Sequence, residues 1–216
     1  MVQFAYFHGY ASSPLSRKGV YLAERLESQG VTLHRPDLNQ PSLSEQSFEK
    51  IFEFLDKFDA THCNPLEKWR IIGSSMGGFI AAAWAERRPE RVDRLLLLCP
   101  GFNMKNRWRA LLGASVMDHW KESGWLTRPD GAGVMTKIHY KNVEELETLP
   151  AFPKAACPCH IIHGRSDETV PFESSEGYCQ ENPELTLIPV DDDHSLMKSL
   201  SMIEQETLEF LGASKE

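Results

Sequence analysis

The sequence lacks several features that mark common functional classes. Its longest apolar run, Leu95–Cys99, is far shorter than the roughly 20 residues that span a bilayer, so membrane insertion is not expected. The start, Met1–Phe4, has no basic segment followed by a long apolar stretch, and we therefore expect no signal peptide. Glycine-rich dinucleotide and P-loop motifs are also missing, which gives no indication of nucleotide chemistry.

Cysteine is scarce, and basic residues are fewer than acidic ones. Five scattered cysteines are an odd number, which argues against a disulfide framework and favours reduced thiols in a cytoplasmic protein. Cys157 and Cys159 are separated by one residue and so do not form a CxxC redox motif. The net charge of −8 repels polyphosphate, and nucleic acid is not an expected partner.

Short apolar runs alternate with helical patterns along the 216 residues, which is typical of βαβ units and a parallel sheet. Their apolar character on both faces suits strands covered by helices on both sides. We predict one domain, residues 1–216, with a doubly wound, mainly parallel α/β sheet of about six strands. The predicted strands are Val2–Phe7, Val31–Arg35, Trp69–Ile72, Val92–Cys99, Cys159–His163 and Leu185–Val190.

Helices are predicted between these strands. The first follows Ser13, a candidate N-cap, and Pro14, a suitable first helical residue. The stretch 101–156 breaks the alternation, because it contains no strand-like run and holds three of the five tryptophans. We interpret it as a helical lid or cap inserted in the domain, with an irregular crossover as the alternative. The aromatic residues proposed to line a substrate pocket are Phe102, Trp108, Trp120 and Trp125.

The strongest chemical signal is the segment Gly73-Ser74-Ser75-Met76-Gly77, which follows an apolar strand and precedes an alanine-rich helix. G-x-S-x-G in this context is typical of a nucleophile elbow. Gly73 and Gly77 carry no side chains that would clash in so tight a turn. Ser75 would stand at a helix N-terminus, where developing negative charge is favoured. A turn without chemistry is the alternative.

The chain order of this architecture is serine, then acid, then histidine. Asp167, in the segment His163-Gly164-Arg165-Ser166-Asp167, follows a late strand and is the candidate acid, although it could merely cap a turn. Of the eight histidines only His194 comes after Asp167, so it is the candidate base. The run Asp191–Asp193 before it could offer metal ligands or form a solvated acidic turn, and we predict no metal site.

An oxyanion hole needs two backbone N–H donors. One belongs to the residue after the nucleophile, Met76, and the other to the loop after the first strand, which gives Tyr10. Gly9 lets the loop backbone come close, and His8 is expected to order the loop rather than to transfer protons. The alternative is a capped turn between strand and helix.

These four segments, in this order, resemble the α/β-hydrolase superfamily over nearly the whole chain. The segment His8-Gly9-Tyr10-Ala11-Ser12-Ser13-Pro14 and the short length are similar to the small bacterial esterases of the YqiA/YcfP type. The resemblance assigns nucleophile, acid and base to Ser75, Asp167 and His194, and implies hydrolysis of esters or thioesters without a cofactor. In such proteins the base usually follows glycine, whereas here it follows Asp193.

The sequence therefore predicts a serine hydrolase that cleaves small-molecule carboxylic esters with small to medium apolar acyl groups. A thioesterase is one alternative. Another is a non-catalytic ligand-binding or interaction module that kept the hydrolase fold, since a fold does not fix a function.

Overall fold

The computed structural model describes residues 2–154 and 156–213. Six parallel strands form one sheet in the order β2-β1-β3-β4-β7-β8. This confirms the predicted fold class, and every predicted strand is present with shifts of a few residues at its ends. The strands are β1 (Val2–Phe7), β2 (Leu33–His34), β3 (Lys68–Ser74), β4 (Val92–Leu98), β7 (Cys159–Gly164) and β8 (Thr186–Val190).

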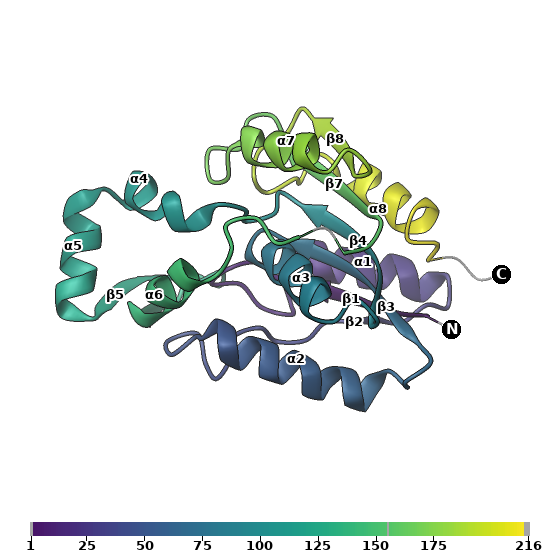
Figure 1. Ribbon diagram of the computed structural model, residues 1–216, viewed down its shortest axis with the longest axis horizontal. Helices are drawn as coiled ribbons and strands as arrows, with labels where there is room; N and C mark the ends of the chain where they lie inside the picture. The colour runs from purple at the N-terminus through teal and green to yellow at the C-terminus, as the bar shows by residue number, and fades with distance from the viewer. Residues whose placement is uncertain (1, 155, 214–216) are drawn as a thin grey trace.

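Helices cover both faces of the sheet (Figure 1). Along β1, Phe4 and Tyr6 point to one hydrophobic cluster, whereas Ala5 and Phe7 point to the other, as the two-residue period of a strand requires. The first cluster is covered by α1 (Arg17–Ser28) and α8 (Leu200–Glu209). The second is covered by α2 (Phe48–His62), α3 (Met76–Arg87) and α7 (Phe172–Glu181).

Helix α3 is the central helix of the domain. Every residue from Met76 to Ala85 is buried, so the helix is apolar all round rather than amphipathic. The run Ala81–Ala83 lets its backbone come close to the sheet. Because α3 follows β3 after a single residue, Ser75, the packing of this helix fixes the position of Ser75.

The cap segment, residues 101–156, leaves the sheet after β4 and projects from one end of the molecule, away from both termini (Figure 1). Its predicted lack of strands is wrong, because β5 (Trp125–Pro129) and β6 (Met135–His139) form an antiparallel hairpin. Asp130 closes the hairpin turn, its Oδ1 accepting hydrogen bonds from the backbone N–H groups of Ala132 and Val134, both at 2.9 Å. The elements are the 3₁₀ turn Met104–Asn106, α4 (Trp108–Leu112), α5 (Ala114–Ser123), β5 (Trp125–Pro129), β6 (Met135–His139) and α6 (Lys141–Thr148).

The start of the first helix also differs from the prediction. The N-cap of α1 is Ser16 rather than Ser13. Ser13 instead closes a short turn, because its Oγ accepts a hydrogen bond from the N–H of Leu15 at 3.2 Å. Pro14 lies in that turn and not in the helix.

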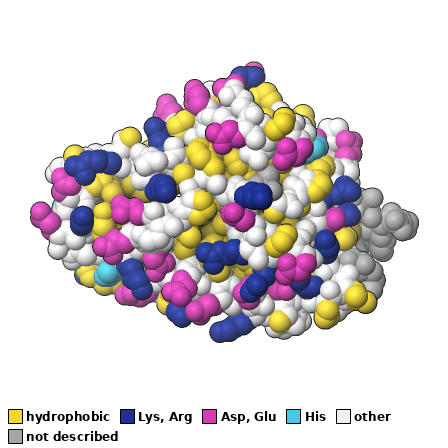
Figure 2. Space-filling model, in the orientation of Figure 1, with side chains coloured by type: hydrophobic (Ala, Val, Ile, Leu, Met, Phe, Trp, Pro, Cys, Tyr) yellow, Lys and Arg dark blue, Asp and Glu magenta, His cyan; other side chains and the backbone are white. Residues whose placement is uncertain are grey.

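One face of the molecule is mixed in charge. On the face presented in Figure 2, acidic and basic side chains are interspersed. Within residues 2–154 and 156–213, we find no helix with the length and apolar character needed to cross a membrane.

The turn between β3 and α3 generates the first prediction. A Cβ at Gly73 would lie 2.7 Å from the carbonyl oxygen of Gly77, so we expect Gly73→Ala to destabilise the fold by about 2 kcal/mol or more. Gly177, within α7, is the matched control: a Cβ there meets nothing within 4 Å, and Gly177→Ala should stabilise by about 0.5–1 kcal/mol. Urea unfolding measures both; equal effects of the two substitutions would refute the tight turn.

Candidate active site

Ser75 occupies a backbone conformation that side chains rarely adopt, with φ 54° and ψ −120°. Hydrogen bonds hold it there: the Ser75 N–H donates to Leu98 O at 2.9 Å, and the Ser75 carbonyl accepts from Gly101 N–H at 2.8 Å. A Cβ at Gly77 would collide with the backbone carbonyl of Phe7. The turn therefore needs glycine at position 77. The close approach at Gly77 also places the turn against the end of β1.

The structure brings together the three side chains that the sequence proposed as nucleophile, acid and base. His194 lies on the loop after β8, with its Nε2 3.0 Å from Ser75 Oγ and its Nδ1 2.6 Å from Asp167 Oδ2. The Asp167 side chain is fully buried, whereas that of His194 is 27% exposed. Only the serine end of this hydrogen-bonded chain is therefore open to a ligand.

Asp167 is held by other groups in addition to His194. Its Oδ1 accepts from the N–H groups of Thr169 and Val170, at 2.9 and 2.8 Å, and its Oδ2 lies 3.3 Å from His163 Nε2. Burial raises the pKa of Asp167, but hydrogen bonds from His163 and His194 outweigh it and hold that pKa below the usual range. The carboxylate is therefore ionised and fixed in position.

His163 is a buried histidine beside Asp167. Its Nδ1 lies 2.7 Å from Ser175 Oγ and its Nε2 3.0 Å from the carbonyl of Val170, so both ring nitrogens are engaged. With Cys99 and Asp167 it places three possible metal ligands within 4.8 Å of one another. Burial raises the pKa of the Cys99 thiol, however, and an engaged imidazole beside a neutral thiol does not suit a metal ion.

The acidic run before His194 organises the loop. Asp192 is 3% exposed, and its Oδ2 accepts from Lys198 N–H at 2.8 Å and from the hydroxyl of Ser199 at 2.9 Å. Asp193 Oδ1 accepts from the N–H of Ser195 at 2.8 Å. The idea of a solvated turn is thus wrong for Asp192, and these two carboxylates face different partners rather than one ion.

Two backbone N–H groups beside Ser75 have the character expected of an oxyanion hole. Within the described residues, neither Tyr10 N nor Met76 N donates a hydrogen bond. The loop of Tyr10 lies against the elbow, because a Cβ at Gly9 would stand 3.3 Å from Ser75 Cβ. His8 orders this loop as expected: its Nδ1 donates to Gly9 O at 2.9 Å and its Nε2 accepts from Leu38 N–H at 2.9 Å.

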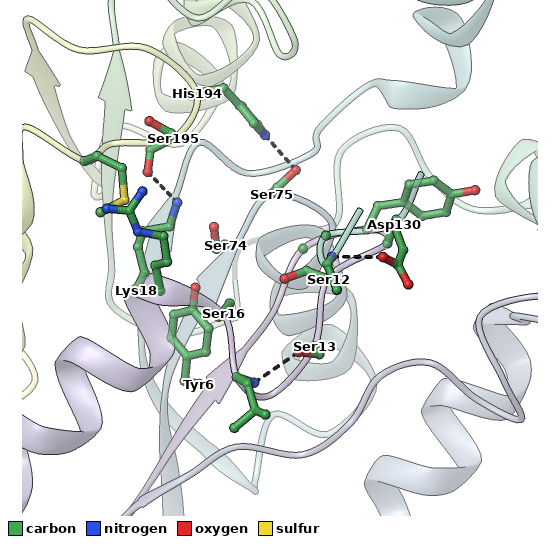
Figure 3. Close-up of a pocket in the computed structure, with 18 residues that line it drawn as sticks. Tyr6, Ser12, Ser13, Ser16, Lys18, Ser74, Ser75, Asp130, His194 and Ser195 are labelled. Atoms are coloured by element: carbon green, nitrogen blue, oxygen red, sulfur yellow. Dashed lines mark hydrogen bonds between the residues drawn. The ribbon is translucent and has the colours of Figure 1, made fainter. Parts of the chain in front are cut away.

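Two cavities meet at Ser75 and His194. One, of about 350 Å³, is largely apolar and lies between the cap segment and helices α2 and α3. We call it the apolar cavity. The other, of about 570 Å³, is lined mainly by polar residues of the loop after β1 and the start of α1 (Figure 3). We call it the polar cavity.

Of the four aromatic residues proposed for the substrate pocket, only Trp108 lines the apolar cavity. Phe102 and Trp120 are fully buried in the core, where the Trp120 N–H donates to Ile138 O at 2.9 Å. Trp125 is 37% exposed and stacks edge-on against His139. The prediction was wrong for these three. Phe102 and Trp120 pack in the hydrophobic core, whereas Trp125 lies at the surface of the β5–β6 hairpin. Wall residues that the sequence did not single out include Phe48, Phe79, Leu111, Leu146, Arg128 and Asn142.

The chain matches the uncharacterised protein family UPF0227 over residues 3–211, which is nearly its whole length. It belongs to this family. No curated protein matches the chain significantly. The predicted resemblance to α/β hydrolases is confirmed, since solved structures of that fold resemble this UPF0227 chain throughout.

Three solved structures illustrate the likeness to this UPF0227 member. A protein from Agrobacterium vitis S4 has a TM-score of 0.81 and 18% identity, covering 99% of this chain and 88% of its own. Mouse alpha/beta hydrolase domain-containing protein 10 has a TM-score of 0.80 and 21% identity, covering 97% and 89%. Est1E from Butyrivibrio proteoclasticus, with bound ferulic acid, has a TM-score of 0.80 and 20% identity, covering 98% and 88%. At these identities the likeness establishes the fold.

The environment of Asp167 makes the stability of the fold depend on pH. Because its pKa is lower in the folded than in the unfolded chain, its ionised form stabilises the protein above the ordinary aspartate pKa, and that stabilisation is lost as the pH falls toward the folded value. Asp167→Asn should cost about 2 kcal/mol at pH 7 and less below about pH 4. Urea unfolding at pH 7, 5 and 3 measures this difference.

Asp118→Asn provides the control, since Asp118 is 58% exposed in a surface pair with Arg109. Its effect should stay below about 1 kcal/mol at every pH. A wild-type advantage over Asp167→Asn that does not change between pH 7 and pH 3 would contradict the assignment of an ionised, stabilising carboxylate.

Proposed function

We propose that this protein is a serine hydrolase that cleaves carboxylic esters through an acyl-enzyme on Ser75. The observation that carries the proposal is the hydrogen-bonded chain from Ser75 Oγ through the His194 ring to Asp167 Oδ2, with its serine end opening into two cavities. A non-catalytic module would have no need of a strained serine, a buried carboxylate and two unpaired N–H donors at one place.

In the proposed mechanism, His194 Nε2 accepts the Ser75 proton as Oγ attacks the ester carbonyl carbon. Asp167 accepts the Nδ1–H bond, which keeps Nε2 free to act as the base and stabilises the imidazolium that forms. The N–H groups of Tyr10 and Met76 donate to the oxyanion. His194 then protonates the leaving alcohol, and water repeats the sequence on the acyl-enzyme.

The apolar cavity supports a small to medium apolar acyl group. Its wall combines Phe48 and Phe79 from the core helices with Leu111 and Leu112 from α4 of the cap segment. About 350 Å³ lies at the small end of ligand-binding pockets. We also propose that the cap segment acts as a lid, because α4 forms the outer wall of this cavity.

The names of some structurally similar proteins describe a bound acid or hydrolase activity. Est1E was solved with ferulic acid bound, and another similar structure, at 14% identity and a TM-score of 0.70, is a variant of PytH, a pyrethroid hydrolase. These are properties of those proteins. They agree with the proposal that this chain is a hydrolase. The proposed ester class rests on the site of this chain alone.

The direct test replaces the proposed nucleophile. Ser75→Ala should reduce kcat/KM for p-nitrophenyl butyrate by about 10³-fold or more while leaving the thermal midpoint nearly unchanged. Ser201→Ala, an exposed serine on α8, is the matched control and should keep wild-type turnover. Wild-type turnover by the Ser75→Ala protein would overturn the proposal.

The acyl assignment is tested separately with Leu111→Trp. Leu111 is 36% exposed in the wall of the apolar cavity, so the larger side chain can enter the cavity without disturbing the core. The ratio of kcat/KM for p-nitrophenyl octanoate to that for the butyrate should fall about tenfold. Val116→Trp, equally exposed on α5 but outside the cavity wall, should leave the ratio unchanged. An unchanged ratio in Leu111→Trp would place the acyl group elsewhere.

A further inference from the structure

The polar cavity is not needed for an apolar acyl group, yet it opens onto the same Ser75 Oγ and His194 ring. Its walls come from the loop after β1, the first turn of α1, the end of β3, the turn between β5 and β6, and the loop that carries His194 (Figure 3). Eight of its lining residues carry a hydroxyl group. The residues that supply them, apart from Ser75 and Tyr10, are Tyr6, Ser12, Ser13, Ser16, Ser74 and Ser195.

The first turn of α1 carries positive charges, although the N-terminus of a helix favours negative ones. Arg17 and Lys18 occupy this turn, no acidic residue is present in it, and the side chain of the N-cap Ser16 accepts no capping hydrogen bond. Because the N-terminus of a helix is already positive, two cations there are unfavourable unless an anion compensates them. Asp130 is the one carboxylate among the described wall residues, and its Oδ1 is engaged by two backbone N–H groups.

Three hydroxyls, those of Tyr6, Ser16 and Ser74, lie together in the floor of the cavity. Tyr6 is 1% exposed and directs its hydroxyl toward Ser16 and Ser74 (Figure 3). The Ser16 Oγ is buried without a hydrogen-bond partner, and Ser74 is 6% exposed. The Tyr6 hydroxyl lies close enough to Ser16 and Ser74 for both to oppose the rise that burial causes in the pKa of Tyr6. Buried hydroxyls are normally paired, and the Ser16 hydroxyl, which has no partner among the described residues, is therefore suited to donate to an acceptor that enters the cavity.

Lys18 joins this floor to the catalytic loop. Its ammonium donates to the carbonyl of Ser195, the residue after His194, at 2.6 Å (Figure 3). This contact uses one of the three protons of the ammonium. Burial lowers the pKa of the Lys18 ammonium, since desolvation penalises its charge. The carboxylates of Asp192, Asp193 and Asp167 act in the opposite direction, as an anion in the cavity also would.

We propose that the polar cavity binds an anionic group, a phosphate or a carboxylate, carried by the leaving alcohol of the ester. The inference rests on the proposed function. The acyl group occupies the apolar cavity, and the alcohol leaves on the side where His194 can protonate it. Lys18, the first turn of α1 and the hydroxyls of Tyr6, Ser16 and Ser74 then surround the anion with donors.

The test compares esters that share one acyl group. The substrates are 1-butyrylglycerol, its 3-phosphate, and the butyrate ester of glycolate, with ethyl butyrate as the uncharged partner of the last. Wild-type kcat/KM should be at least about tenfold higher for an anionic ester than for its neutral partner. The preference should weaken as salt rises. A preference for only the phosphate or only the carboxylate identifies which anion the cavity takes.

Variants separate the anion site from the loop contact of Lys18. Lys18→Gln, Tyr6→Phe and Ser16→Ala should each lower the ratio of anionic to neutral kcat/KM, and the last two do not touch the His194 loop. Lys57→Gln, an exposed lysine on α2, removes the same charge elsewhere and should keep the ratio. Inorganic phosphate should inhibit wild-type hydrolysis of p-nitrophenyl butyrate competitively and inhibit Lys18→Gln less.

The possible results are distinguishable. Turnover of neutral esters with no anionic preference, or a preference that survives in all three variants, overturns the anion site and leaves the proposed function intact. Absence of turnover for every ester overturns the proposed function itself.

Discussion

The close approach of α3 to the end of β1 is the contact on which the site depends. At Gly77 the helix backbone lies so near the Phe7 carbonyl that no side chain fits between them. This contact sets two things at once: the strained conformation of Ser75 and the position of the loop that carries Tyr10. The proposed nucleophile and both proposed oxyanion donors are therefore fixed relative to one another by core packing, before any ligand is present.

A second close approach fixes the other half of the site. Gly164, at the end of β7, lets the carbonyl of Asp192 come within 2.5 Å of where a Cβ would be, and the Ser166 N–H donates to that same carbonyl at 3.0 Å. The loop of the proposed acid and the loop of the proposed base are thus bound together by their backbones. Asp192 fixes the second loop internally through Lys198 and Ser199. Asp193, which stands where similar hydrolases usually have glycine, accepts a hydrogen bond from the Ser195 N–H at 2.8 Å across His194.

The sequence predicts those parts of the site that depend on residues close together in the chain or on chain order. The elbow is a local signal, and chain order then selects Asp167 and His194, so these positions could be read without a structure. The walls of the cavities could not be, because they join residues far apart in the chain. Lys18 meets Ser195 across 177 positions, and the apolar cavity combines Phe48 of α2 with Leu146 of α6. The hairpin β5–β6 was missed for a local reason, since its exposed strands carry polar residues such as Arg128 and Lys137 that obscure the alternation.

The central claim is that Ser75, activated by His194, is the nucleophile. Incubation with a fluorophosphonate, followed by intact-mass and peptide mass spectrometry, tests it most directly, because such reagents phosphonylate activated serines. The expected result is a single adduct on Ser75 that is nearly absent in His194→Ala. An unlabelled protein, or an adduct on the neighbouring Ser74 instead, would contradict the claim.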